Sequence, residues 1–322
     1  SLTASTAWFA RSMKAGSKNA VIVLGPTASG KTRLGVRLAR ALGGEIVSAD
    51  SRQAYRGLTL GSGKDLDEYV VDGAPVPYHL IDIVDLSHEF NVFEYQQRFY
   101  DVFETLRTRG IMPIVVGGTG LYLEAVWRGY RMVEAPENPA LRAELALLPD
   151  EALAARLRAV KTSLHNTTDT TDRDRLIRAI EIAEYAQAHV PPPAPDIRAA
   201  LLGVRWPRPI LRARIRDRLR ARFDAGMIDE VKGLLEQGVS YQTLDFLGLE
   251  YRYIARYFRG EIRDFGCLLD QLAVAIGQFA KRQETWFRRM ERNGAPIHWV
   301  DGADERLALE FLKQEGILPR AM

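Results

Sequence analysis

Two hydrophobic patterns alternate along the first third of the chain. Apolar runs with the length of a strand occur at residues 21–24, 45–50, 79–84 and 113–116. Between the first two runs, Leu34, Leu38 and Leu42 recur at helical spacing until Gly43 and Gly44 end the segment. Strands that alternate with helices over short connections predict a parallel sheet covered on both faces, with ligands at the carboxyl ends of its strands.

Two further helices follow from local signals. Asn91 is a favourable N-cap, and Glu94 three residues later completes a capping-box-like pattern, so a helix is expected from there to Gly110. The run at 113–116 leads into the glycine-rich segment 117–120 and another stretch of helical spacing. The order of strand, glycine turn and helix therefore occurs twice.

The pattern becomes purely helical in the middle of the chain. Helical spacing alone covers about 138–188, and the PPPAP run at 191–195 is typical of a stiff linker. The apolar run at 199–206 predicts a strand that rejoins the sheet, and 208–290 is helical again.

These boundaries define the expected domains. Residues 19–135 and 196–322 should form an α/β core with a helical C-terminal part, and 136–195 an all-helical insertion domain. Residues 1–18 have no apolar stretch of signal-peptide length, and we expect a disordered extension there.

Composition is that of an ordinary globular protein, with 47% hydrophobic and 26% charged residues among 322. No uninterrupted apolar stretch approaches eighteen residues, so we expect no membrane association and a cytoplasmic location. The single cysteine, Cys267, excludes an intramolecular disulfide. The five histidines have no zinc-ligand spacing, which argues against a dedicated zinc site.

The segment GPTASGKT, which joins the first strand to the first helix, matches the P-loop pattern of phosphate-binding proteins. In this pattern Gly25 and Gly30 permit the tight turn, and backbone N–H groups cradle an anion at the helix N-terminus. Lys31 would reach an outer phosphate, and the Thr32 hydroxyl would bind Mg²⁺. Because strand, loop and helix occur together, a chance match is the weaker interpretation, and the core is predicted to be P-loop NTPase-like.

The second strand is expected to end on an acidic residue, Asp50, at the sheet edge where ligands bind. It could serve as a metal ligand or general base, or it could only cap the following turn. The apolar run at 113–116 ends in glycines rather than in the acidic residue typical of motor ATPases, which argues against that class.

Arginine is concentrated in the C-terminal half. Eight arginines and one acidic residue lie between Arg205 and Arg222, and the segment 281–292 mixes cations with Trp286 and Phe287. Cations for phosphates beside flat rings for bases are typical of a surface for single-stranded or looped RNA. Solvated basic helices with core aromatics are the alternative.

Six motifs occur in an order that resembles the tRNA dimethylallyltransferase family from about residue 20 to 300. They are GPTASGKT, SADSRQAY, VPYHLIDIVD, PIVVGGTGLYL, RLIRAIEI and AKRQETWFRR. The resemblance implies transfer of a dimethylallyl group from dimethylallyl diphosphate to N6 of adenosine 37 in the tRNA anticodon loop. It implies Mg²⁺ as cofactor, release of diphosphate, and a protein we expect to be monomeric.

The resemblance also assigns roles to residues. Asp50 falls on the general base, Arg218 on the arginine that helps hold the diphosphate, and Thr119 on the reaction channel. The diphosphate-binding loop is implied to comprise Gly25, Pro26, Thr27, Ala28, Ser29, Gly30, Lys31 and Thr32. On chemical grounds Thr27 could also donate to the bridging oxygen where the bond breaks. The tRNA-contacting residues are implied to be Asp50, Ser51, Arg52, Gln53, Asp174, Arg175, Arg178, Lys281, Arg282, Gln283, Trp286 and Arg288.

The residue chemistry is compatible with this assignment. An adenine amino group is a poor nucleophile, so a carboxylate such as Asp50 would take its proton as the new bond forms. The departing diphosphate would be stabilised by loop N–H groups, Lys31, Arg218 and Mg²⁺. To reach its site, the adenine would leave its base stack.

The chain departs from the family pattern at 61–65, 247–251 and 276–277. These positions lie mostly near the expected tRNA surface, so they bear on which tRNA is read. The alternatives are a small-molecule P-loop kinase in which Asp50 binds the acceptor hydroxyl, a prenyltransferase that acts on free AMP, and a non-catalytic RNA-binding paralogue.

Overall fold

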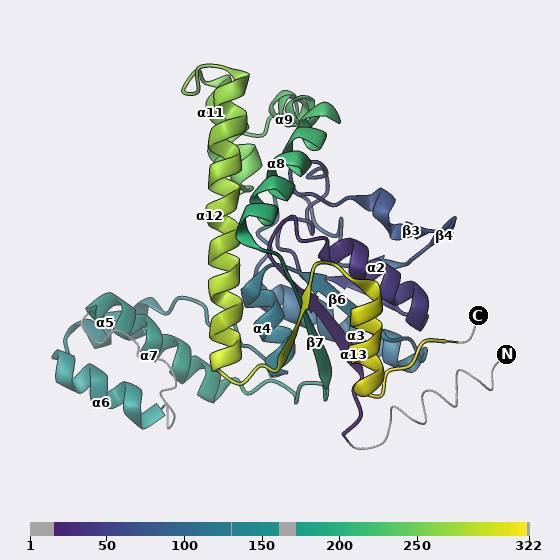
Figure 1. Cartoon of the computed structure of the whole chain (residues 1–322). Helices are drawn as coiled ribbons and strands as arrows, with labels where there is room; N and C mark the ends of the chain where they lie inside the picture. The colour runs from purple at the N-terminus through teal and green to yellow at the C-terminus, as the bar shows by residue number, and fades with distance from the viewer. Residues whose placement is uncertain (1–15, 130, 161–171, 321–322) are drawn as a thin grey trace. The chain divides into compact units, whose positions relative to one another are not determined.

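The computed structural model describes residues 16–129, 131–160 and 172–320 (Figure 1). The chain divides into two compact units. The larger contains the described residues up to Gly129 and those from Pro195 onward, and the smaller contains the described residues between them. Most of the expected N-terminal extension, residues 1–15, lies outside the described residues.

A parallel sheet of six strands forms the centre of the larger unit, as the sequence predicted. In spatial order its strands are β5 (Tyr78–His79), β2 (Glu45–Ser48), β6 (Pro113–Gly117), β1 (Ala20–Leu24), β7 (Ala199–Arg205) and β8 (Ile297–Asp301). All residues of β1 and β6 are buried, because layers cover both faces of the sheet. A separate antiparallel pair consists of β3 (Val70–Val71) and β4 (Ala74–Pro75).

Helices surround this sheet, and the longest of them, α12, follows one side of the unit in Figure 1. Their bounds are α2 (Lys31–Leu42), α3 (Val92–Thr108), α4 (Gly120–Arg128), α8 (Arg208–Asp224), α9 (Met227–Glu236), α10 (Tyr241–Phe246), α11 (Leu249–Phe258), α12 (Phe265–Arg292) and α13 (Glu305–Gln314). A short 3₁₀ turn, η1, covers Leu66–Tyr69. No helix among the described residues is long and apolar enough to cross a membrane.

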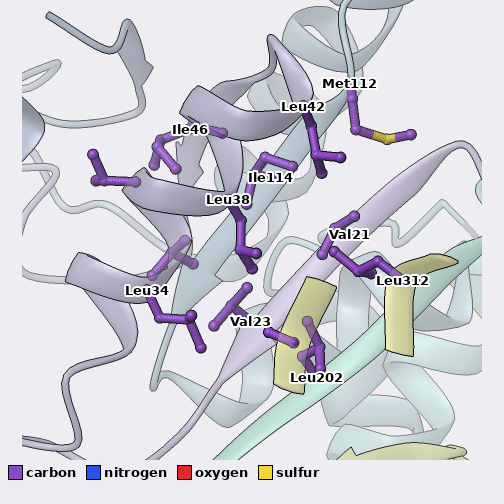
Figure 2. Packing of buried hydrophobic residues seen from close by; sticks show 14 of the residues in the cluster. Val21, Val23, Leu34, Leu38, Leu42, Ile46, Met112, Ile114, Leu202 and Leu312 are labelled. Carbon is purple, nitrogen blue, oxygen red and sulfur yellow. The ribbon is translucent and has the colours of Figure 1, made fainter. Parts of the chain in front are cut away.

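Hydrophobic clusters stabilise the larger unit, and two of them lie among the described residues as follows. In the first, Leu34, Leu38 and Leu42 of α2 pack on Val21 and Ile114 of the sheet (Figure 2). The second cluster joins the helices that follow β7. Its members on α8 and α12 include Leu211, Ile215, Leu219, Leu268, Leu272 and Ile276. The sheet and the C-terminal helices are therefore each built around their own apolar core.

The predicted helix ends are confirmed. Gly43 ends α2 in the left-handed region at φ 63°, where glycine is favoured. The Asn91 side chain accepts a hydrogen bond from the Glu94 amide at 3.0 Å and starts α3. Gly110 follows the end of α3 at φ 68°.

The smaller unit contains three described helices, α5 (Pro139–Ala146), α6 (Asp150–Val160) and α7 (Arg173–Ala188), in segments predicted to be helical. Residues 161–171 of the expected insertion lie outside the described residues. Leu145, Leu153, Leu157, Leu176 and Ile180 form its core. The boundaries 136–195 remain a prediction.

Its buried carboxylate, Glu181, accepts two hydrogen bonds of 2.9 Å from Arg142. This pairing is the main cause that lowers the pKa of Glu181 to about 2. The carboxylate of Glu181 is therefore ionised at neutral pH, and its ion pair with Arg142 connects α7 to α5.

Some sequence expectations were wrong. The strand expected at 79–84 is limited to β5, because Leu80 and Asp82 adopt left-handed conformations at φ 65° and 55°. The strand expected to end on Asp50 ends at Ser48, so the carboxylate lies in the following turn. The edge strand β8 and the helix α13 were not anticipated.

Candidate active site

The loop of residues 25–32, called the anion loop below, joins β1 to the N-terminus of α2. Gly30 has a φ of 82°, as a glycine-dependent turn requires, and Ala28 also adopts a left-handed conformation at φ 61°. Gly25 is needed for space instead, since a Cβ there would lie 2.9 Å from Ser29 Oγ and 3.1 Å from the Val204 carbonyl oxygen. The tight turn leaves the helix N-terminus facing open space, which is the geometry of an anion site.

Two carbonyls of the anion loop are held by Trp206 in the β7–α8 connection and by Arg214 of α8. Trp206 Nε1 donates to the Ser29 carbonyl at 2.7 Å, and Arg214 Nε donates to the Ala28 carbonyl at 2.8 Å. The Arg214 guanidinium also lies over the Trp206 ring, 4.2 Å from its centroid. Because C=O and N–H of a trans peptide point in opposite directions, these contacts turn the amide N–H groups of Ser29 and Gly30 away from Arg214 and Trp206.

Lys31 is half-buried at the first position of α2, and its Nζ donates to the Pro26 carbonyl at 3.2 Å. Burial and then the positive charge of Arg218 lower the pKa of Lys31 to about 8, while Asp50 and Asp65 oppose the shift. The ammonium is therefore destabilised without an anion. A bound diphosphate would relieve this cost, which favours anion binding at this position.

A cavity of about 830 Å³ opens at the carboxyl ends of the strands. The anion loop, the turn after β2, the loop after β6, α8 and α12 all contribute to its wall. This location is where ligands bind in parallel α/β folds. Within the described residues, Ser29 Oγ, Trp286 Nε1 and Arg222 Nε are buried atoms of its wall that have no hydrogen-bond partner.

Asp50 lies in the cavity wall, and its two carboxylate oxygens differ. Oδ1 accepts from the amides of Arg52 at 2.9 Å and Gln53 at 3.2 Å, so it caps the turn. Oδ2 has no partner among the described residues. The two interpretations of Asp50 from the sequence are thus compatible, because one oxygen fixes the turn and the other remains available to a ligand.

Thr119 lies beside Asp50. Its Oγ1 accepts from the Ser51 amide at 3.2 Å, and its own amide donates to the Ala49 carbonyl at 3.3 Å. Thr119 also lines the cavity, as do Ser51, Arg52 and Gln53. The structure therefore brings these predicted residues together with Asp50; their roles toward the nucleic acid remain predictions.

Arg218 also reaches the cavity from α8, as the spacing of the arginines allowed. Its Nη2 donates to Asp65 Oδ2 at 2.6 Å and to the Gly63 carbonyl at 3.2 Å. The backbone of Asp65 is left-handed, with a φ of 48°. Sequence reasoning identified 61–65 only as a departure from the family pattern and missed this counter-ion of Arg218.

The same segment is fixed by a second carboxylate. Glu230 accepts from the amides of Leu60 at 2.7 Å and Gly61 at 3.2 Å, and from the Tyr251 hydroxyl at 2.5 Å. A Cβ on Gly61 would lie 2.4 Å from Tyr251 Cζ, so the tyrosine leaves no room for a larger residue. Two departures from the family pattern, at 61–65 and 247–251, therefore pack against each other.

Helix α12 carries the predicted tRNA-contacting cluster, and its members have different surroundings. Lys281, Arg282 and Arg288 are exposed. Trp286 is half-buried against Gly120. Gln283 is only 8% exposed and makes its hydrogen bonds inside the protein, so its observed contacts are not those of a surface residue.

The predicted residues of the smaller unit are also engaged. Asp174 lies in the first turn of α7, where its amide donates to the Asp172 cap at 3.1 Å. Arg175 is exposed and forms an ion pair with Asp172 at 3.3 Å. Arg178 pairs with Glu181 and donates to the Ala135 carbonyl at 2.9 Å. Of the two cations, Arg175 is therefore more accessible than Arg178.

Comparison with known proteins identifies the family. A family model described as IPP transferase matches residues 53–290, and one described as isopentenyl transferase matches residues 18–74. A tRNA dimethylallyltransferase 1 of Geotalea uraniireducens is 54% identical over 93% of this chain and 98% of its own length. The chain belongs to the IPP transferase family.

Other members of the IPP transferase family agree with this assignment. A tRNA dimethylallyltransferase 2 of Syntrophotalea carbinolica is 55% identical over 90% of this chain and 96% of its own length. The crystal structure of a full-length tRNA isopentenylpyrophosphate transferase from Bacillus halodurans is similar with a TM-score of 0.66 and 30% identity. That match covers 93% of this chain and 98% of the solved one.

Proposed function

We propose that this protein transfers a dimethylallyl group from dimethylallyl diphosphate to N6 of adenosine 37 in the tRNA anticodon loop. The names of its relatives support transfer to tRNA. One observation carries the proposal. Lys31 of the anion loop and the unpartnered Oδ2 of Asp50 line the same cavity, so an anion clamp and a base can act on one reaction.

In this reaction the bond between the dimethylallyl C1 and the bridging oxygen breaks, and a bond from N6 to C1 forms. The N6 proton passes to Asp50 Oδ2, and the electron pair of the broken bond leaves with the diphosphate. Lys31 and Arg218 stabilise the growing negative charge, and Thr27 donates near the bridging oxygen. The anion loop therefore holds a leaving group.

We further propose Mg²⁺ as the cofactor. Among the described residues no three His, Cys, Asp or Glu side chains are grouped to hold a metal ion. The Thr32 hydroxyl nevertheless lies at the cavity, and Mg²⁺ commonly combines a protein oxygen of this kind with ligand phosphates and water. When bound in this way, the ion would neutralise charge on the diphosphate.

The adenine would be flipped out of the loop, and basic surface groups would offset the unstacking. Lys281, Arg282 and Arg288 of α12 supply exposed cations, and Trp286 supplies a ring. Arg175 of α7 is exposed as well. We propose that these residues contact tRNA and that one monomer is sufficient for the reaction.

The first experiment incubates the protein with labelled dimethylallyl diphosphate, Mg²⁺ and an anticodon stem-loop that contains adjacent adenines at positions 36 and 37. We expect prenylated RNA from the wild type and a loss of about a hundredfold or more for Asp50→Ala, as for removal of a general base. Asp224→Ala, which removes an exposed carboxylate of α8, is the control. Equal turnover by wild type and Asp50→Ala would exclude Asp50 as the base, and consumption of ATP with phosphoryl transfer would favour the kinase.

The second experiment tests the RNA surface. Lys281→Ala should weaken stem-loop binding and reduce the slope of log affinity against log salt by about one, with diphosphate binding unchanged. Lys232→Ala on α9, which also removes an exposed lysine, should leave the slope unchanged. A wild-type slope in Lys281→Ala would show that this side chain does not contact RNA.

A further inference from the structure

The side chain of Gln283 joins two loops that follow different strands. Its Oε1 accepts a hydrogen bond of 2.8 Å from the Thr27 amide in the anion loop after β1. Its Nε2 donates a hydrogen bond of 3.1 Å to the Gly118 carbonyl in the loop after β6. The partners are 256 and 165 residues away along the chain, and the side chain is 8% exposed.

The loop after β6 is shaped to admit α12. A Cβ on Gly118 would lie 2.5 Å from Gln283 Nε2, and one on Gly120 would lie 2.3 Å from Trp286 Cδ1. Neither glycine has a left-handed φ, so space rather than backbone conformation requires them. Gln283 and Trp286 are three residues apart and share one helix face. The glycines found in place of an acidic residue thus allow close packing of this face.

The chemistry of the bridge requires a neutral amide. One end must accept from an N–H and the other must donate to a C=O, and among side chains of this length only glutamine does both without charge at neutral pH. A carboxylate would repel the Gly118 carbonyl and add negative charge to the wall of an anion site. A lysine could not accept from the Thr27 amide.

We propose that Gln283 is a positioning residue that holds the anion loop in its diphosphate-binding shape, rather than a residue that contacts tRNA. This inference rests on the proposed function, in which the loop binds the diphosphate. By fixing the Thr27 amide, Gln283 sets the start of the turn whose later amides and Lys31 face the ligand. By holding the Gly118 carbonyl, it also fixes the loop that carries Thr119.

The test measures binding of inorganic diphosphate with Mg²⁺ by calorimetry, and binding of the anticodon stem-loop separately. Gln283→Ala should weaken diphosphate binding by about fivefold to tenfold, the effect of one or two neutral hydrogen bonds. Stem-loop binding should stay within about twofold of wild type. Gln278→Ala removes an exposed glutamine from the same helix and should change neither. Thermal melting establishes that each variant is folded.

Gln283→Glu supplies a second readout that a purely structural residue would not give. At pH 7.5 its carboxylate should weaken diphosphate binding by about tenfold or more. At pH 5.5 a protonated carboxyl can accept from Thr27 and donate to Gly118, so the affinity should return to within about threefold of wild type. Wild type is measured at each pH, because Lys31, Asp50, Arg218 and Arg282 share the cavity and the diphosphate itself titrates.

The outcomes are distinct. Failure of wild type to bind diphosphate would contradict the proposed function itself. Normal diphosphate binding by Gln283→Ala together with weaker stem-loop binding would overturn the inference and make Gln283 a tRNA-contacting residue. A Gln283→Glu variant with no recovery at low pH would also overturn it.

Discussion

The loops after β1 and β6 have the same order of strand, glycine-rich turn and helix, yet glycine serves a different purpose in each. In the anion loop, Gly30 takes a left-handed conformation so that the helix N-terminus faces a ligand. In the loop after β6, Gly118 and Gly120 provide room for two side chains of α12. Similar sequences can therefore form either a ligand site or a packing contact. Gly25 of the anion loop is also required for space, so the left-handed φ of Gly30 is the feature that distinguishes the two loops.

The largest expected effect comes from adding a side chain to the loop after β6, residues 118–120, which is called the packing loop below. Gly120→Ala would place a methyl group 2.3 Å from Trp286 Cδ1, so the ring must move, and such overpacking costs about 1–3 kcal/mol of unfolding free energy. Urea unfolding measures this cost. Gly277→Ala in α12 meets nothing within 4 Å and should stabilise the protein by about 0.5–1 kcal/mol. A Gly120→Ala protein as stable as wild type would show that the ring is not confined.

A smaller effect is expected from the titration of Lys31 in the anion loop. The pKa of Lys31 is lowered to about 8, so above pH 8 the unliganded protein loses the ammonium that binds the anion. Affinity for inorganic diphosphate, measured by calorimetry, should fall by up to about tenfold per pH unit above pH 8, or about 1.4 kcal/mol. Lys31→Arg keeps its charge and should show no such decline. An equal decline in both proteins would assign the titration to another group.

The lowered pKa of Lys31 also affects folding stability, and stability changes with pH in the opposite direction to diphosphate affinity. Between pH 8 and 10.5 the unfolded chain still holds the Lys31 proton while the folded protein has lost it. The contribution of Lys31 to folding therefore becomes more favourable as pH rises through this window, even as ligand affinity falls. Urea unfolding of wild type and Lys31→Arg across the window separates this contribution from those of other groups.

The smallest expected effect comes from removing the hydrogen bond that Trp206 donates to the Ser29 carbonyl of the anion loop. Trp206→Phe keeps a ring under Arg214 but removes the donor to the Ser29 carbonyl, a loss of about 0.5–1.5 kcal/mol. Because the packing loop has no contact with Trp206 among those described, diphosphate affinity should fall while the environment of Trp286 stays the same. Fluorescence of the remaining tryptophans and calorimetry measure the two. Unchanged affinity for diphosphate would mean that the anion loop keeps its shape without the Trp206 hydrogen bond.

The sequence predicted the features that depend on neighbours along the chain. Apolar runs located β1, β6 and β7, and Asn91 and Gly43 marked helix ends, because capping and periodicity act within a few residues. The strand at 79–84 was overestimated because apolar content does not report the left-handed turns at Leu80 and Asp82. The anion loop was recognisable because its whole function lies in eight consecutive residues.

The remaining site features depend on residues that only folding brings together. The contact of Arg218 with Asp65 spans 153 positions, and that of Arg214 with Ala28 spans 186. Periodicity placed these arginines on a helix but could not say which carbonyl or carboxylate each would meet. The burial of Gln283 was missed for the same reason, since a polar residue in a basic segment is expected to face solvent.

The place of β7 between β1 and β8 has a consequence for synthesis on the ribosome. Strand β1 emerges early, but its neighbour β7 begins at residue 199, after the whole smaller unit has been translated. Trp206, Arg214 and Gln283, which hold the anion loop, emerge later still. A nascent chain that stops short of β7 therefore carries the complete P-loop motif without any of these three contacts, and one that stops short of α12 still lacks the contact with Gln283.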